Sequence, residues 1–162
     1  FGATIKGYGT GAGTVNKPLS IEVDYQGNLY YTQAGDFFPV HMIIPNLSGD
    51  FAVYSSGFQP DASDIMDASV YGSALDIAVD ENKNIYIVDG LDSEVIVFDA
   101  SGNYFKEAGY NFKDGIEEKV MNKPMALTVD ERGVVYVCDR GNGAIYRFKL
   151  SNSLDEGLKL ED

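Results

Sequence analysis

The sequence predicts an all-β repeat protein, and three observations support this fold class. Three segments of the 162-residue chain align with one another. Within each segment apolar residues alternate with a period of two, which is typical of half-buried strands. The chain also contains 18 Gly, several of them in short polar stretches between the alternating segments. Together these features predict about three units, each built from four antiparallel strands.

The first two strands of each unit are marked by motifs at constant spacing. The first motif occupies residues 18–24, 74–80 and 124–130, and each copy ends in Asp. The second motif has a Tyr six positions after that Asp, at Tyr30, Tyr86 and Tyr136. The offset between units is 56 residues and then 50 residues for both Asp and Tyr. A repeat of this length indicates a supersecondary unit that stacks on its neighbours.

A short polar turn follows each first strand. Asp24 and Asp130 begin turns whose fourth position is Gly27 or Gly133. An Asp at the first position can accept bonds from the N–H groups of the turn, and Gly tolerates a positive φ. The second unit has Lys83 in the Gly position. We therefore expect a distorted turn in that unit.

Further alternating segments predict the outer strands. Third strands are expected at residues 40–44, 95–98 and 144–148, and fourth strands at residues 51–54 and 104–107. The third unit is expected to lack its fourth strand because residues 151–162 are polar, whereas residues 1–9 have the pattern of an orphan outer strand. A four-stranded antiparallel unit is the plan of a β-propeller blade. The predicted blades span about residues 18–57, 74–108 and 124–150.

These motifs resemble the NHL repeat. The resemblance covers most of residues 15–150 and is best in the third unit, while the first unit departs from it after Tyr31, with Gln33 in place of Asp. It implies a propeller that usually closes with six blades, of which this chain would supply about three. The matching residues of the third unit are Pro124, Val129, Asp130, Gly133, Tyr136, Val137, Asp139, Asn142, Ile145 and Phe148.

A half-ring would expose edge strands and one apolar blade face. Two alternatives would complete it: a homodimer that closes a six-bladed ring, or a longer propeller of which this chain is one part. The first residue, Phe1 rather than Met, favours the longer propeller. Together with the acidic composition it also favours a secreted or cell-surface origin.

The charge excludes some partners. The formal net charge is −13, from 25 acidic and 12 basic residues. Nucleic-acid binding needs clustered Lys and Arg, so we expect no nucleic-acid partner. An anionic membrane would repel this surface, and no apolar run reaches the length of a membrane span, so we expect no membrane insertion.

No catalytic constellation is present. His41 is the single histidine, which rules out a multi-histidine metal site within one chain. Cys138 lies in a predicted strand and is expected to be a small buried hydrophobe. We therefore expect no catalytic residue, no bound metal and no cofactor. Propeller hydrolases hold calcium with carboxylates near the central channel, and by that resemblance Glu22, Asp76 and Asp89 are conceivable contributors.

The longer loops are expected on one rim of the propeller. They comprise residues 34–39 and the two inserts at residues 58–73 and 109–123. Insertions collected on one face commonly mark the binding face of a repeat protein. We expect a non-enzymatic module that binds a protein or peptide. The alternatives are a calcium-dependent hydrolase or lyase that needs further blades, and a structural spacer of a surface protein. The candidate contact residues are Phe37, Phe38, Leu91, Asp92, Arg140 and Asn142.

Overall fold

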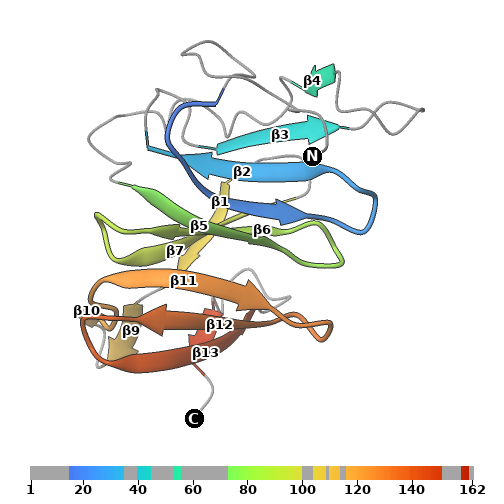
Figure 1. Ribbon diagram of the computed structural model, residues 1–162. Coiled ribbons are helices and arrows are strands. Elements are labelled where there is room, and N and C mark those ends of the chain that lie inside the picture. Colours follow the sequence, from blue (N-terminus) through green and yellow to red (C-terminus); the bar gives the residue numbers. More distant parts are fainter. Residues whose placement is uncertain are drawn as a thin grey trace.

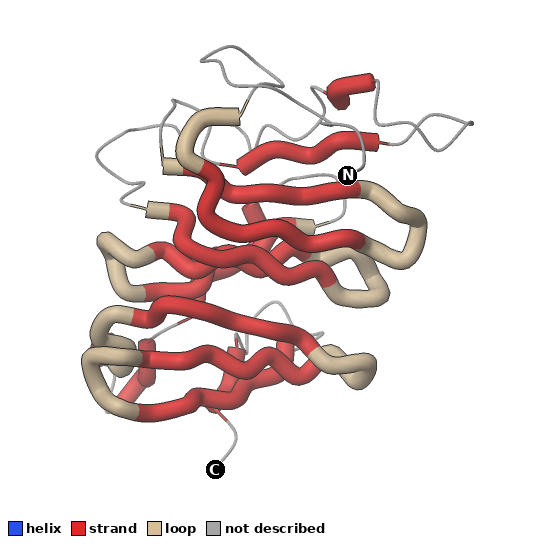
Figure 2. The backbone as a smooth tube through the Cα atoms, in the orientation of Figure 1, coloured by secondary structure: helices blue, strands red, loops and turns tan. Residues whose placement is uncertain are grey.

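The computed structural model describes residues 15–34, 40–44, 53–55, 73–99, 104–108, 110–113, 116–150 and 158–160. These residues form three four-stranded antiparallel sheets and one two-stranded hairpin (Figures 1 and 2). The first sheet contains β1 (Pro18–Val23), β2 (Leu29–Gln33), β3 (Val40–Ile44) and β4 (Val53–Ser55). The second contains β5 (Ala74–Val79), β6 (Ile85–Asp89), β7 (Glu94–Phe98) and β8 (Tyr104–Ala108). The third contains β11 (Pro124–Val129), β12 (Val134–Asp139), β13 (Ala144–Leu150) and β14 (Leu158–Leu160).

The three sheets follow the same plan and stack on one another. In each sheet the spatial order of the strands equals their order in the chain. The first strands of the three sheets, β1, β5 and β11, lie side by side across the stack (Figure 1). This arrangement confirms the predicted all-β class and the four-stranded unit. In the described part of the chain, no helix is long and apolar enough to cross a membrane.

The third sheet has a fourth strand where the sequence analysis predicted none. Strand β14 pairs with β13 through Leu158 opposite Leu150 and Leu160 opposite Phe148. Its alternation of apolar and polar residues was obscured by the polar stretch around it. Residues 1–9, the expected orphan strand, lie outside the described residues. The insert at residues 109–123 contains the hairpin of β9 (Tyr110–Lys113) and β10 (Ile116–Lys119), whereas of residues 58–73 only Ser73 is described.

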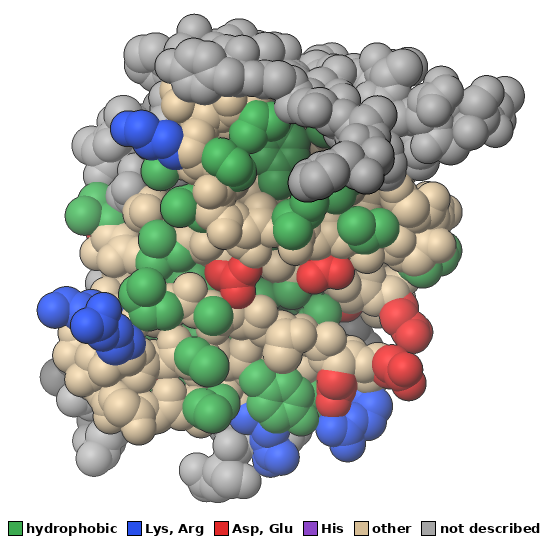
Figure 3. All heavy atoms as spheres, in the orientation of Figure 1, with side chains coloured by type: hydrophobic (Ala, Val, Ile, Leu, Met, Phe, Trp, Pro, Cys, Tyr) green, Lys and Arg blue, Asp and Glu red, His purple; other side chains and the backbone are tan. Residues whose placement is uncertain are grey.

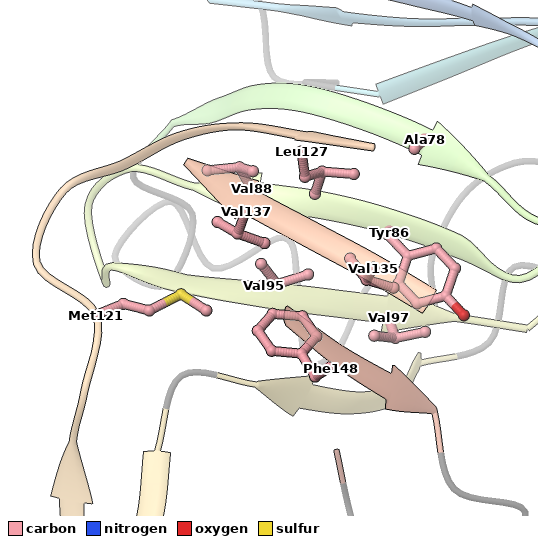
Figure 4. Packing of buried hydrophobic residues seen from close by; sticks show 10 residues of the cluster. All are labelled: Ala78, Tyr86, Val88, Val95, Val97, Met121, Leu127, Val135, Val137 and Phe148. Carbon is pink, nitrogen blue, oxygen red and sulfur yellow. The ribbon is translucent and has the colours of Figure 1, made fainter. Parts of the chain in front are cut away.

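Apolar side chains fill the space between adjacent sheets. Figure 4 shows the core between the second and third sheets, where side chains from β6 and β7 meet those from β12 and β13. A second core lies between the first and second sheets and includes Tyr30, Ile87 and Phe98. The Tyr and Phe of these cores contribute large apolar areas. Each sheet therefore buries apolar side chains against its neighbours, as stacked repeats do.

The two outermost faces of the stack lack the packing found between sheets. Ile21 on β1 is 64% exposed, whereas its counterpart Ile77 in the second sheet is 2% exposed. Ile145 on β13 is 71% exposed, whereas its counterpart Val95 is fully buried. Cys138 also lies on this outer face and is exposed, so the expectation of a buried cysteine is wrong. The reason is that no fourth sheet covers this face in the described part of the chain.

The turns after the first strands are alike in all three sheets. Lys83 has a φ of 64°, close to the 81° of Gly27 and the 74° of Gly133. The Lys83 amide donates to the Asp80 carbonyl oxygen at 2.9 Å, as the equivalent Gly amides do in the other two turns. The predicted distortion is therefore wrong, because Lys83 adopts the left-handed conformation that Gly has elsewhere.

The Asp that begins each turn stabilises it with its side chain. In the first sheet, Asp24 Oδ1 accepts the backbone N–H groups of Gln26 and Asn28 at 2.8 and 2.9 Å. Asp24 Oδ2 accepts the Asn28 side-chain amide at 2.7 Å and the Tyr30 hydroxyl at 3.2 Å. Asp80 repeats all four bonds in the second sheet. These carboxylates therefore hold turns, which explains why one recurs in every unit.

Candidate functional site

Two equivalent turns lie next to each other on one rim of the stack. One joins β6 to β7 and the other joins β12 to β13. Backbone bonds fix each turn to the segment that enters its sheet: the Gly90 amide donates to the Ser73 carbonyl at 2.9 Å, and the Arg140 amide donates to the Lys123 carbonyl at 3.1 Å. The Lys123 amide also donates to Ser93 Oγ at 3.3 Å, which links the second sheet to the third. The two turns therefore form one continuous rim surface.

The rim presents an apolar and a basic side chain to solvent. Leu91 is 61% exposed in the β6–β7 turn. Arg140 is exposed in the β12–β13 turn, and Asp92 is half-buried. Figure 3 shows Lys and Arg side chains on the left rim of the view, where β12 ends. The structure thus places Leu91, Asp92 and Arg140 in these two rim turns, while Phe37 and Phe38 lie outside the described residues.

Asn142, another candidate contact residue, uses its side-chain nitrogen to hold the rim together. This nitrogen lies 2.7 Å from the Val120 carbonyl oxygen, 2.9 Å from the Tyr146 hydroxyl and 3.2 Å from Asp139 Oδ2. Gly141 is required beside it, because a Cβ atom there would lie 1.8 Å from the Asn122 carbonyl oxygen. Asn142 therefore positions the turn that carries Arg140.

Asp139 is the residue around which the β12–β13 turn is built. Its Oδ1 accepts the Asn142 backbone N–H at 3.0 Å. Its Oδ2 accepts the Asn122 backbone N–H at 2.6 Å as well as the Asn142 side-chain amide. Both oxygens of this buried carboxylate are thus satisfied by N–H donors, as buried acidic groups require.

The equivalent turn of the second sheet contains three carboxylates. One carboxylate oxygen from each of Asp89, Asp92 and Glu94 lies within 4.8 Å of the other two. Asp89 is fully buried and Glu94 is 5% exposed. Asp89 Oδ1 accepts the backbone N–H groups of Leu91 and Asp92 at 2.8 and 3.3 Å. Among the described residues, no hydrogen-bond donor reaches Asp89 Oδ2.

Burial raises the pKa of the Asp89 carboxyl above its ordinary value. The negative charge of Asp92 raises it further, while the amides of Leu91, Asp92 and Ser73 oppose the shift. Desolvation and a like charge both disfavour the ionised carboxylate.

The other carboxylates considered for a channel site lie elsewhere. Asp76 accepts a hydrogen bond from Ser20 Oγ in the first sheet and one from the Leu127 backbone N–H in the third, the latter at 2.8 Å. It therefore connects three first strands across the stack. Among the described residues, Asp89 groups with Asp92 and Glu94, and neither Glu22 nor Asp76 belongs to that group.

His41 is part of the interior of the first sheet. Its ring is fully buried and stacks on the ring of Tyr31 with the centroids 4.8 Å apart. Its Nε2 lies 2.9 Å from the side-chain nitrogen of Gln33. Because the Gln33 nitrogen can only donate, His41 Nε2 is the acceptor. These contacts assign His41 to packing and hydrogen bonding within the sheet.

Comparison with known proteins supports the architecture. No protein-family model and no curated protein sequence matches the chain. Virginiamycin B lyase from Staphylococcus aureus, a β-propeller, aligns with 90% of this chain at a TM-score of 0.53 and 18% identity. Hydrazine synthase from Kuenenia stuttgartiensis aligns with 89% of the chain at a TM-score of 0.54 and 16% identity. The chain spans 40% and 36% of these two proteins.

The sheets and these similarities together define the class of the protein. It is an all-β protein built from propeller-type blades, each a four-stranded antiparallel meander. The low identities restrict the conclusion to the fold, because function resides in sites that differ between proteins of one fold.

Proposed function

We propose that this chain is a binding module that presents the rim formed by the β6–β7 and β12–β13 turns to a protein or peptide. The observation that carries the proposal is the placement of exposed Leu91 beside the turn that exposes Arg140. Apolar side chains and Arg next to one another are suited to anchor a partner, since Arg is enriched in interfaces. The turns are held by hydrogen bonds, so little ordering is needed when a partner binds.

The NHL-type repeat supports the same proposal. Units of this pattern are expected to place their longer connections on one rim, and the connection between the second and third sheets contains the β9–β10 hairpin. We infer that the blades belong to an NHL-like ring whose loop-rich rim is the binding face. Its ligand is a protein or peptide and not a nucleic acid, because the net charge is −13.

Selection of peptides on the intact chain tests this proposal. A phage-displayed random peptide library would be panned on the chain, and the selected peptides would be synthesised and measured by fluorescence polarisation. We expect the double variant Leu91→Ala/Arg140→Ala to weaken binding by about tenfold or more, as loss of central anchors does in other interfaces.

The matched control is Tyr25→Ala in the β1–β2 turn. Tyr25 is 71% exposed but lies at the opposite end of its sheet from the proposed rim. We expect this variant to bind the selected peptides as the unchanged chain does. Peptides that lose affinity for the Tyr25 variant and keep affinity for the rim variant would overturn the proposal.

A further inference from the structure

The β6–β7 and β12–β13 turns occupy the same place in two consecutive repeats, but their side chains differ. Asp89 corresponds to Asp139 at the 50-residue offset, and both are buried. At the same offset, Asp92 corresponds to Asn142. Glu94 corresponds to Ala144. The second repeat therefore has two additional acidic groups around the same buried carboxylate.

This difference removes a hydrogen-bond donor from the buried Asp. In the third sheet, the Asn142 side-chain amide donates to Asp139 Oδ2. In the second sheet, ionised Asp92 has only acceptor oxygens at that position. Among the described residues, Asp89 Oδ2 has no hydrogen-bond partner, although Asp89 is fully buried and its carboxylate faces those of Asp92 and Glu94. A buried acceptor without a donor is costly.

Like charge adds to this cost. Three carboxylates lie together in the turn, and the fully buried Asp89 has no hydrogen-bond partner at Oδ2 among the described residues. Buried charges in proteins are normally paired or coordinate a metal. A cation at the turn would satisfy Asp89 Oδ2 and offset the repulsion at the same time.

We propose that Asp89, Asp92 and Glu94 bind one calcium ion on the rim of the second sheet. All three ligands are carboxylates, which are the oxygen donors that hard cations prefer. Their oxygens lie within 4.8 Å of one another. Two oxygens that each bind one calcium ion at about 2.4 Å are at most about 4.8 Å apart, so the spacing fits calcium. Magnesium demands near-ideal octahedral geometry and keeps several of its waters, so a site made of three protein carboxylates suits it less well than calcium.

The site belongs to a single blade and extends the proposed binding function. It rests on residues of the β6–β7 turn, whereas the channel site considered for a propeller hydrolase would take carboxylates from several blades. The turn also carries exposed Leu91. Calcium would therefore stabilise the loop that presents one of the proposed contact residues.

Thermal unfolding of the chain tests the proposal. The protein would be treated with a chelator, dialysed, and then melted in increasing calcium chloride at constant ionic strength. We expect the Tm to rise by roughly 3–6 °C at a calcium concentration about ten times the Kd. Isothermal titration should give one calcium ion per chain, and magnesium chloride at equal concentration should give a smaller shift.

Two variants give the β6–β7 turn the residues that the third repeat has at the equivalent positions. They distinguish calcium binding from a turn whose acidic residues have only a structural role. Asp92→Asn recreates Asn142, and Glu94→Ala recreates Ala144. We expect Asp92→Asn to unfold at or above the Tm of the calcium-free chain, since it supplies a donor for Asp89, and both variants to lose the calcium response. Glu131→Gln removes an exposed acid from the opposite end of the third sheet and should keep that response.

The calcium proposal can be tested separately from the proposed binding of a protein or peptide. A Tm that is unchanged by calcium up to about 10 mM, beyond the range of weak extracellular calcium modules, would overturn it. An equal calcium response in the unchanged chain and in Asp92→Asn would also overturn it. Peptide binding measured in chelator tests the proposed function independently, because Leu91 and Arg140 are not calcium ligands.

Discussion

Asp80 and Tyr86 form a buried pair whose protonation affects stability. The Tyr86 hydroxyl donates to Asp80 Oδ2 at 2.9 Å, and Tyr86 is fully buried. Burial raises the pKa of the Tyr86 phenol above its ordinary value, and the negative charge of Asp80 raises it further. Tyr30 and Asp24 repeat this arrangement in the first sheet. The folded chain therefore holds its phenol protons at a pH where the unfolded chain releases them.

The pair predicts a loss of stability at alkaline pH. An unfolded Tyr releases its proton near pH 10. Because the pKa of Tyr86 is raised in the folded state, the stability it contributes is fully present below pH 10 and is lost as the pH rises above it. We expect the Tm of Tyr86→Phe to fall less than that of the unchanged chain between pH 9 and 11. At pH 7 the variant should be about 1 kcal/mol less stable, since a buried hydrogen bond is lost.

Tyr25→Phe is the control for this experiment, because Tyr25 is exposed in the turn of the first sheet. Its Tm should follow that of the unchanged chain over the whole pH range. Equal alkaline losses in Tyr86→Phe and the unchanged chain would contradict the role of the buried pair.

The sequence revealed the role of some residues and not of others. The turn-forming role of Asp24, Asp80 and Asp130 was predictable because Asp in a repeated turn has a local physical function. The exposure of Cys138 was not predictable, since it depends on whether another sheet covers β12. The carboxylate group around Asp89 was also missed. Its signal was the change from Asn142 to Asp92 between aligned repeats.

At the scale of elements, the turn between β5 and β6 keeps its geometry although it lacks Gly. Lys83 has a φ of 64° in the position where the other two sheets have Gly27 and Gly133. For a residue with a Cβ atom, this region of φ and ψ costs about 1–2 kcal/mol of conformational free energy. The Lys83 amine lies 2.6 Å from the Gln26 side-chain oxygen, but this contact is exposed. The turn therefore stores local strain that the surrounding sheet maintains.

Lys83→Gly should relieve this strain. We expect the free energy of unfolding to increase by about 0.5–1 kcal/mol, because the relief exceeds the extra backbone entropy that Gly loses. Urea denaturation measures the change. The reverse substitution, Gly133→Ala, should destabilise the chain by about 1 kcal/mol, since a Cβ atom there meets open space and only the positive φ opposes it. A decrease in stability for Lys83→Gly would show that the Gln26 contact outweighs the strain.

The prediction of elements succeeded where the repeat was strong. The first three strands of each sheet follow from period-two alternation, and the motifs of the first two strands also recur at constant offsets. Strand β14 was missed because it has only three residues within a polar stretch, although β4 and β8 are its counterparts in the other sheets. The β9–β10 hairpin was missed because its strands have only four residues each and have no counterpart in the other described connections. Pairing of such short strands depends on the partner that tertiary structure places beside them.

At the scale of the whole molecule, each sheet is stabilised mainly by the sheets on either side of it. The second sheet is covered on both faces, and its β6 and β7 are buried throughout. The outer faces of the first and third sheets expose Ile21 and Ile145. We infer that further blades cover these faces in the working protein. A second copy of the chain and a longer chain are the two alternatives that the sequence left open.

The matched pair Ile77→Ala and Ile21→Ala tests this view of the stack. Ile77 lies in the core between the first two sheets, so its truncation should cost about 2–5 kcal/mol. Ile21 occupies the same strand position on an open face, and its truncation in a monomer should cost less than about 1 kcal/mol. Equal costs in a monomer would contradict the open face.

Light scattering identifies what covers the exposed face of the first sheet. A mass of two chains that falls to the mass of one chain in Ile21→Asp would assign the face to a second copy. A single-chain mass for both proteins would assign it to the blades of a longer chain, because a ring can close only when every blade has a neighbour on each face.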